Sequence, residues 1–255
     1  MKKIVLIVEY DGNLYNGFQN QSEAPTIQNT IETALSKLTN ETISIQAAGR
    51  TDSGVHALSQ VISFTTMSNN QISTYISGTN HFLPDDISIK NVYEVNMDFD
   101  PRRMALSRRY QYTIDCGLTR SPLTGKFAYF LGKTLNITLM KKASKYFLGI
   151  HDFRNFSKSK RNECKNTLRE IYNININKFE KMVYIHIEGS AFLSRQVRRM
   201  CGALVEVGTG IIKPNLIKKM LDSTIIKEIP QTLPAHGLCL TGVNYKYFNS
   251  DGDLK

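Results

Sequence analysis

The order of predicted elements repeats once along the chain, and this repeat is the strongest constraint on its fold. In the first half, β-branched and apolar runs predict strands over residues 3–10, 43–48, 59–66 and 87–95. Apolar residues at helical spacing predict helices over 26–38 and 72–82. The resulting order, β-α-β-β-α-β, is the split β-α-β or ferredoxin-like pattern.

The second half repeats this order without obvious sequence identity. Strands are predicted over 109–115, 167–176, 182–188 and 238–247, and helices over 139–148, 192–207 and 216–221. We therefore expect an α+β protein of two ferredoxin-like lobes, residues 1–103 and 104–255, whose strands form a mainly antiparallel mixed sheet. Pro101 interrupts a highly charged stretch at the junction. A cleft between such lobes is a natural place for a large ligand.

The composition of the chain limits which kinds of binding partner and which cellular compartment we expect for the protein. The chain has 255 residues and a formal charge of +10, which suits a polyanion such as nucleic acid, although a generally lysine-rich composition explains it equally well. The four cysteines are far apart and the histidines form no HExxH, so no zinc motif is present. Scattered thiols are typical of a reducing cytosol. Ile4–Val8 is too short for a signal peptide and no apolar run has membrane length, so we expect a cytoplasmic protein.

Residues 49–57 read Gly-Arg-Thr-Asp-Ser-Gly-Val-His-Ala, and Asp52 stands at their centre. The predicted strands on either side place this segment in a loop, where reactive groups are commonly displayed on a rigid scaffold. Asp-Ser-Gly is also ordinary turn chemistry. These nine residues alone leave a plain turn and a reactive carboxylate equally open.

Two glycine motifs resemble nucleotide-binding sequences but do not support that function. Gly49-xxxx-Gly54 is followed by Val55 and His56 in place of the Lys-Ser/Thr pair of a phosphate loop. Gly208-Thr-Gly210 has Lys213 in place of the third glycine of a dinucleotide fingerprint, and it follows a predicted helix rather than a strand. We therefore expect no nucleotide cofactor.

Basic residues gather at the expected lobe junction, after His151-Asp-Phe153, and on the predicted helix 192–207. They are Arg102, Arg103, Arg108, Arg109, Lys158, Lys160, Arg161, Arg195, Arg198 and Arg199. On the helix, Val197, Met200 and Leu204 mark the buried face. Arg195 and Arg199 point away from that face, toward solvent or a phosphate, with solvent the commoner case. Arg198 lies on the flank, where an arginine usually needs a partner.

Two tyrosines alternate with polar residues on the strand 109–115. Tyr110 and Tyr112 should point the same way, opposite to Arg109. For Tyr112 we predict a place in the core. For Tyr110 the strand pattern leaves two roles open, a core residue and a stacking platform for an unpaired base.

Short sequence blocks stand in a characteristic order along almost the whole chain. They are Tyr10-Asp-Gly12, Gly17-Phe-Gln19, Gly49 to Ala57, Asn80-His-Phe-Leu-Pro-Asp85, Phe99-x-x-Arg102-x-x-Ala105, Arg109-Tyr110-x-Tyr112, His151-Asp-Phe153, Phe192 to Gly202, and Ala235-x-Gly237-Leu238. In content and order these blocks resemble the tRNA pseudouridine synthase A family. The Gly-Arg-Thr-Asp block is highly specific to it.

The resemblance implies two ferredoxin-like lobes around a deep basic cleft, and a homodimer in which each tRNA contacts both subunits. It implies isomerisation of uridine to pseudouridine in the tRNA anticodon arm, typically at positions 38 to 40, with no cofactor and no metal. Asp52 matches the catalytic aspartate, Tyr110 the tyrosine that stacks on the target uracil, and Arg198 the basic residue that pairs with the aspartate. The candidate RNA-binding residues are Arg50, which matches an arginine that helps displace the target base, and Gln19, Arg102, Arg108, Arg109, Lys158, Arg195 and Arg199.

The chemistry of such a reaction accounts for a carboxylate in a basic chain. The bond from uracil N1 to ribose C1′ breaks, the base turns, and C5 joins C1′, with no net redox change. A carboxylate can act there as nucleophile or base if it stays ionised, and a nearby arginine favours the ionised form. Attack on C1′, attack on C6 and removal of a ribose proton all stay open for Asp52.

Three positions depart from the family pattern, and they can alter contacts with the substrate. Asn20 and Asp100 stand where relatives commonly have Arg and His, and Arg103 replaces a common aromatic residue. Two alternative functions remain. A related synthase could act on other tRNA or RNA sites, and a non-catalytic RNA-binding module would share the basic surface but give no reason for Asp52.

Overall fold

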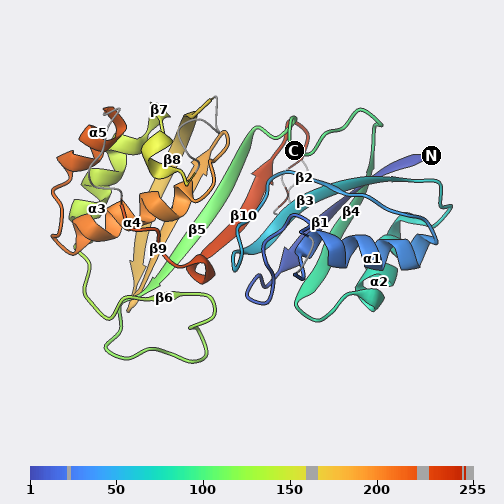
Figure 1. Ribbon diagram of the computed structural model, residues 1–255, viewed down its shortest axis with the longest axis horizontal. Helices are drawn as coiled ribbons and strands as arrows, with labels where there is room; N and C mark the ends of the chain where they lie inside the picture. The colour runs from blue at the N-terminus through green and yellow to red at the C-terminus, as the bar shows by residue number, and fades with distance from the viewer. Residues whose placement is uncertain (22–23, 159–165, 223–229, 249, 251–255) are drawn as a thin grey trace. The chain divides into compact units, whose positions relative to one another are not determined.

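The computed structural model describes residues 1–21, 24–158, 166–222, 230–248 and 250 (Figure 1). The chain divides into two compact units. The first is Met1–Leu106 together with the chain from Cys239, and the second is Ser107–Leu238. Ten strands and five α-helices occur among the described residues, which confirms the predicted α+β class.

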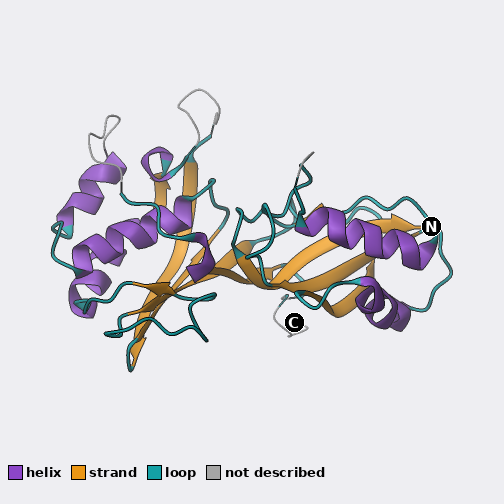
Figure 2. Cartoon of the chain, turned by 60° about the horizontal axis from the view of Figure 1, so that its bottom comes forward, coloured by secondary structure: helices purple, strands orange, loops and turns teal. Residues whose placement is uncertain are grey.

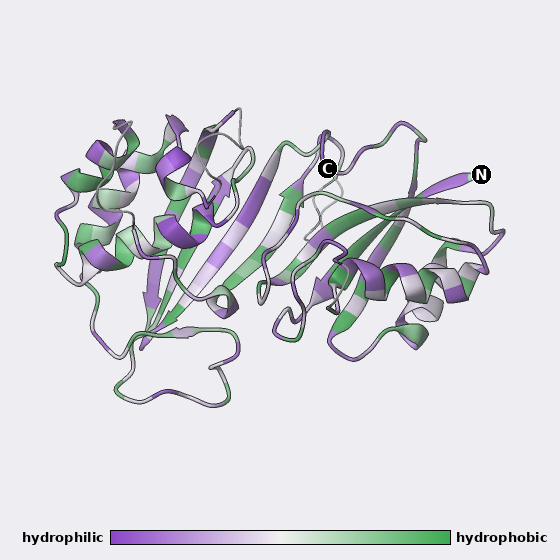
Figure 3. Cartoon of the chain, viewed as in Figure 1, coloured by the Kyte–Doolittle hydropathy of each residue, from purple (hydrophilic) through white to green (hydrophobic). Residues whose placement is uncertain are grey.

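The sheet of the first unit is built around β1 (Lys2–Tyr10). This strand pairs antiparallel with β4 (Ile87–Val95) on one side and with β3 (His56–Thr66) on the other. From Ile4 to Val8 each residue is at most 1% exposed, so both faces of β1 are covered. An unbroken apolar run is typical of a strand buried on both faces. Figure 3 shows hydrophobic residues along the strands of this unit.

The two helices of the first unit confirm the predicted ones. They are α1 (Ile27–Thr39) and α2 (Ile72–Phe82), which contact each other. Thr26 precedes α1 and caps it, because its Oγ1 accepts the N–H of Asn29 at 3.3 Å. The helix ends at Thr39, because the next residue, Asn40, has a left-handed φ of 57° that stops further helical hydrogen bonding.

The strand predicted over residues 43–48 is wrong in extent, since only β2 (Gln46–Ala47) pairs with β3. Ile43 and Ile45 are buried as their apolar character suggests. Their N–H groups, however, donate to side chains of α1: Ile43 N to Ser36 Oγ at 3.1 Å and Ile45 N to Glu32 Oε1 at 3.0 Å. Side chains of α1 therefore accept the N–H groups that a longer strand would have used to pair with its neighbour.

The last strand, β10 (Leu238–Asn244), ends earlier than the predicted 238–247, because Tyr245 N turns back to donate to Phe248 O. Its residues Cys239 and Leu240 pair in parallel with His56 and Ala57 of β3. Rings of Tyr245 and Phe248 also pack on Phe99. These contacts place the C-terminal strand in the first unit, so the division by contacts differs from the expected lobes 1–103 and 104–255.

The second unit contains an antiparallel sheet in the order β5-β9-β8-β7. Its strands are β5 (Ser107–Asp115), β9 (Met182–Gly189), β8 (Leu168–Phe179) and β7 (Gly149–Asp152). A short strand β6 (Tyr129–Phe130) runs parallel to β5. Neither β6 nor β7 was predicted, because two and four residues are too few to show a period in the sequence.

The helices of the second unit lie together along one side of its strands (Figure 2). They are α3 (Ile137–Ser144), α4 (Gln196–Gly208) and α5 (Asn215–Asp222), with 3₁₀ turns at Lys145–Phe147, Arg154–Phe156 and Ala235–Gly237. The predicted buried face of α4 is confirmed, since Val197, Met200 and Leu204 are at most 5% exposed. No helix of the described residues is long and apolar enough to cross a membrane.

Two predicted helix boundaries in this unit are wrong. The helix predicted from residue 192 begins at Gln196, because Arg195 has a left-handed φ of 62° that a helix cannot include. The helix predicted over 139–148 begins at Ile137, capped by Asn136, and tightens after Ser144 into a 3₁₀ turn. Both differences arise from local backbone geometry that apolar spacing does not report.

Candidate active site

Asp52 lies in the loop that joins β2 to β3, as the sequence predicted. The loop closes with a turn in which Val55 N donates to Asp52 O at 3.1 Å and Gly54 has a φ of 77°. Asp52 itself is half-buried, whereas Thr51 before it is buried. The presence of a turn therefore does not exclude a reactive carboxylate at Asp52, because the turn itself presents the Asp52 side chain.

The segment Tyr10–Phe18, which we call the clasp, crosses this loop and holds both neighbours of Asp52. Phe18 N donates to Thr51 O at 3.1 Å, and Ser53 Oγ donates to Tyr15 O at 3.2 Å. The hydroxyl of Tyr10 is hydrogen-bonded to Thr51 Oγ1 at 2.8 Å. The residue on each side of Asp52 is thus held by a different residue of the clasp.

Two glycines allow the clasp to approach the loop. A Cβ on Gly12 would lie 2.1 Å from Val55 O. Gly17 has a φ of +86°, and a Cβ there would lie 3.0 Å from Thr51 O and 3.2 Å from Ser53 N. The blocks Tyr10-Asp-Gly12 and Gly17-Phe-Gln19 thereby acquire a physical role as supports of the Asp52 loop.

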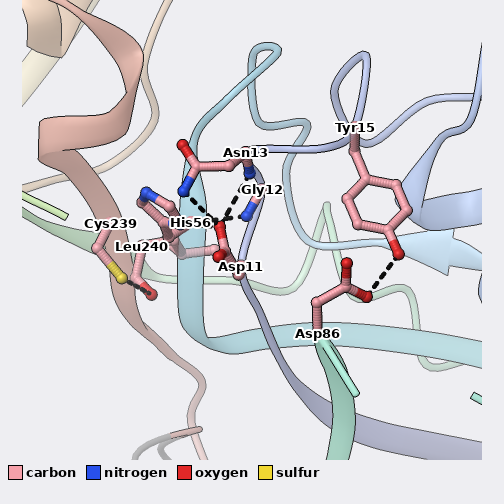
Figure 4. Close-up of polar contacts among 8 residues, drawn as sticks. All are labelled: Asp11, Gly12, Asn13, Tyr15, His56, Asp86, Cys239 and Leu240. Carbon is pink, nitrogen blue, oxygen red and sulfur yellow. Dashed lines mark hydrogen bonds and ion pairs between the residues drawn. The ribbon is translucent and has the colours of Figure 1, made fainter. Parts of the chain in front are cut away.

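The clasp is also anchored by Asp86, the residue directly before β4. Tyr15 donates its hydroxyl to Asp86 Oδ1 at 2.7 Å (Figure 4). Asp11 N donates to Asp86 O at 2.9 Å. Burial and the Asp86 carboxylate raise the pKa of Tyr15 above its usual value, so the hydroxyl remains a donor at ordinary pH. Sequence reasoning did not single out Tyr15 or Asp86 as support residues.

In the second unit, Tyr110 and Tyr112 point to the same side of β5, opposite to the half-buried Arg109, as predicted. Tyr112 is fully buried and donates to Pro234 O at 2.8 Å, which confirms its place in the core. Tyr110 is 8% exposed, and its ring meets Phe192 edge to face, with centroids 5.3 Å apart. That contact limits rotation of the Tyr110 ring.

Arg198 is half-buried on α4 and has the partner that its flank position predicted. Its Nε donates to Leu233 O at 2.7 Å. Leu233 belongs to Gln231–Pro234, which we call the strap. A side chain holds each of the other strap residues in turn: Glu206 accepts from Gln231 N, Arg199 donates to Thr232 Oγ1, and Tyr112 donates to Pro234 O.

The remaining RNA-binding candidates fall into two groups. Gln19, Arg50, Arg102 and Lys158 are exposed. Arg108, by contrast, is 8% exposed and donates to Ser190 O at 2.8 Å. Arg199 donates to Ser157 O and Thr232 Oγ1, and burial lowers its pKa from the usual value, so the expectation of a solvated Arg199 is wrong. Arg195 is half-buried, and Lys160 and Arg161 lie outside the described residues.

The candidate site residues are distributed over both units. Asp52, Arg50, Gln19 and Arg102 belong to the first unit, and Tyr110, Arg198 and the other basic residues belong to the second. Two of the departures from the family pattern make local bonds in the first unit. Asn20 Nδ2 donates to Glu32 Oε2 at 2.8 Å, and Asp100 Oδ1 accepts the N–H groups of Arg102 and Arg103. No metal-binding cluster of His, Cys, Asp or Glu occurs in the part of the chain that the structure describes.

Comparison with known proteins agrees with this arrangement of motifs. A family model described as tRNA pseudouridine synthase matches residues 6–102 and 143–246. The tRNA pseudouridine synthase A of Geotalea daltonii is 39% identical over 247 residues, covering 96% of this chain and 100% of the relative. That of Acetivibrio thermocellus is 40% identical over 245 residues, with the same coverage. Among solved structures, one titled "Structure of H/ACA RNP bound to a substrate RNA containing 2'-deoxyuridine" has a TM-score of 0.39 and 11% identity, covering 79% of this chain and 44% of that chain.

The family match and the close relatives define an RNA-modifying isomerase. The chain belongs to the tRNA pseudouridine synthase family. It converts uridine to pseudouridine in tRNA.

Proposed function

We propose that Asp52 is the catalytic carboxylate of this synthase, that Tyr110 stacks on the target uracil, and that Arg198 pairs with Asp52. The observation that carries the proposal is the anchoring of Thr51 and Ser53 by the clasp. It leaves Asp52 half-buried between two fixed neighbours. A reacting group held in this way needs little reorganisation on the path to the transition state.

The reaction balances without any external reagent. The N1–C1′ bond breaks, the C5–C1′ bond forms, and the proton lost from C5 is matched by one gained at N1. Asp52 would act as nucleophile or base in its ionised form, and the positive charge of Arg198 would favour that form. The Leu233 carbonyl supports this role, because it orients the guanidinium through Nε.

Tyr110 would compensate part of the cost of removing the target base from its helical stack. Enzymes that act on a base in a stem must extrude it, and stacking on an aromatic ring returns about 1–3 kcal/mol per base. The edge-to-face contact with Phe192 supports this role, since a ring with restricted rotation offers a fixed plane to the base.

We further propose that the target lies in the anticodon arm, at positions 38 to 40, and that the enzyme is a cytoplasmic homodimer. The ordered motifs of the family across the whole chain support these proposals. The exposure of Gln19, Arg50, Arg102 and Lys158 supports their contact with RNA. Arg108, Arg109, Arg195 and Arg199 would contribute positive charge from the second unit. Light scattering of the purified protein tests the dimer, and a mass of one chain contradicts it.

The deciding experiment maps pseudouridine in unmodified tRNA transcripts incubated with wild type and with Asp52→Asn. Pseudouridine at positions 38 to 40 with wild type alone supports the target and the role of Asp52 together. Modification only at other tRNA sites would favour the related synthase with a different target. An active Asp52→Asn variant would remove Asp52 from the chemistry.

A further inference from the structure

His56 is a buried ionisable residue, 4% exposed, that the proposed chemistry does not use. It follows the Asp52 loop directly, as the first residue of β3. Its Nδ1 lies 3.1 Å from Gly12 N, and it also lies 3.1 Å from Asp11 Oδ1 (Figure 4). Both partners belong to the clasp, so His56 joins the end of the loop to the segment that crosses it.

The two contacts of Nδ1 require opposite positions of the imidazole proton. The N–H of Gly12 points at Nδ1, which can accept it only without a proton. The Asp11 carboxylate would instead need a proton on Nδ1. Asp11 Oδ1, however, already accepts from Asn13 N at 2.9 Å and from Asn13 Nδ2 at 2.8 Å. The geometry therefore favours a neutral imidazole with its proton on Nε2.

From Gly12 a short series of contacts leads to Asp52. Gly12 lies so close to the loop that a Cβ would be 2.1 Å from Val55 O. Further along the clasp, Tyr15 and Phe18 hold Ser53 and Thr51, the residues on each side of Asp52. If Gly12 were released from His56, the clasp would be free to lift from Val55, and the anchors of Asp52 would shift with it.

We propose that His56 is a positioning residue for Asp52. Its unprotonated Nδ1 accepts the Gly12 N–H and so keeps the clasp in contact with the loop. This inference rests on the proposed role of Asp52, and His56 acts through the loop backbone rather than on the RNA. The neighbouring Cys239 thiol adds no charge to this arrangement, because burial raises the pKa of Cys239 to about 12.

Three substitutions separate the acceptor from the bulk of the side chain. His56→Leu removes the acceptor, His56→Asn restores one at the same number of bonds from Cα, and His56→Gln places it one carbon farther away. We expect His56→Leu to lower kcat on tRNA by about 10- to 100-fold with KM changed by less than about twofold, the scale of a misplaced reacting group. His56→Asn should recover most of the loss, and His56→Gln should not.

Thr66→Val is the matched control at the opposite end of β3. Thr66 is 2% exposed and donates to Glu41 Oε2 at 2.7 Å, so its loss should lower the melting temperature without lowering kcat. If His56→Leu does not fold, the difference in kcat between His56→Asn and His56→Gln tests the inference instead. Normal kcat in His56→Leu, or equal kcat in the Asn and Gln variants, overturns the inference. Asp52→Asn is measured in the same assay: activity there overturns the role of Asp52 itself, whereas an inactive Asp52→Asn beside a normal His56→Leu overturns only the positioning role.

Discussion

Asp52 and Arg198 are held in different ways in their two units. In the first unit the contacts act on the residues beside Asp52: residues of the clasp bond to Thr51 and Ser53, and glycines allow the close approach. In the second unit the contact acts on the side chain, because Arg198 Nε donates to the strap at Leu233. The clasp therefore sets the placement of the loop that carries Asp52, whereas the bond to Leu233 O acts on the Arg198 side chain itself.

This difference has a consequence for substitutions. Changing the Asp52 side chain leaves the bonds of Thr51 and Ser53 to the clasp in place. Changing Arg198 also removes the donor to Leu233 O and loosens the strap. Chemistry and stability should thus separate at residue 52 and change together at residue 198.

The largest effect is expected from Arg198→Ala compared with Asp52→Asn. Arg198→Ala should lower kcat at saturating tRNA by about 100-fold or more, since it removes a preorganised positive charge, and it should also lower the melting temperature. Asp52→Asn should abolish turnover with a melting temperature close to wild type. Kinetics and thermal melts of both variants check this, and normal turnover in Arg198→Ala would show that it does not pair with Asp52.

Next in size is the effect of adding a methyl group where each support is tightest. In Gly12→Ala the new Cβ would lie 2.1 Å from Val55 O, and in Gly202→Ala it would lie 2.0 Å from Gln231 O of the strap. Each should cost about 1–3 kcal/mol of unfolding free energy through overpacking, measured by urea unfolding. Gly49→Ala is the control, because nothing lies within 4 Å of its added carbon. Equal stability of all three variants would contradict the close approach.

Removing one tyrosine hydroxyl from each unit compares the anchor of the clasp with the anchor of the strap. Tyr15→Phe removes a bond to the Asp86 carboxylate and Tyr112→Phe removes one to the Pro234 carbonyl. Bonds to charged groups contribute about 1.5–3 kcal/mol and neutral ones about 1 kcal/mol. Urea unfolding should therefore show a larger loss for Tyr15→Phe. The reverse order would mean that the strap, not the clasp, has the stronger anchor.

Salt dependence separates exposed cations from internal ones. Arg50→Gln or Lys158→Gln should each reduce the slope of log K against log salt for tRNA binding by about 1 if they contact phosphates. Arg108→Gln should mainly lower stability, because its guanidinium donates to Ser190 O within its own unit. Filter binding at several salt concentrations measures the slopes, and an unchanged slope in the first two variants would remove them from the RNA contacts.

The smallest effect is expected at Asp100. The backbone N–H of Arg103, followed by that of Arg102, holds the pKa of Asp100 below its usual value. A carboxyl with a lowered pKa stabilises the folded state above its unfolded pKa, and this stability is lost as pH falls through the folded pKa. The difference in melting temperature between wild type and Asp100→Asn should therefore shrink below about pH 4. A constant difference across this range would contradict the assignment.

Much of the fold could be predicted because long periodic segments report their own burial. The strand around Ile4–Val8, the helix capped by Thr26 and the buried face of α4 all carry their pattern locally. Residues 43–48 could not be predicted, because their N–H groups pair with Ser36 and Glu32 of a helix. Nor could the start of α4, which depends on the left-handed backbone of Arg195.

The candidate site divides in the same way. The sequence by itself determined the family, the reaction and which residues match the family's catalytic trio, because those residues stand in specific blocks of fixed order. Only the tertiary structure decided what supports them: the clasp over the Asp52 loop, the contact of His56 with Gly12, and the strap that holds Arg198. The physical reason is that hydrogen bonds and close approaches join residues far apart in the chain, whereas a motif records only its neighbours.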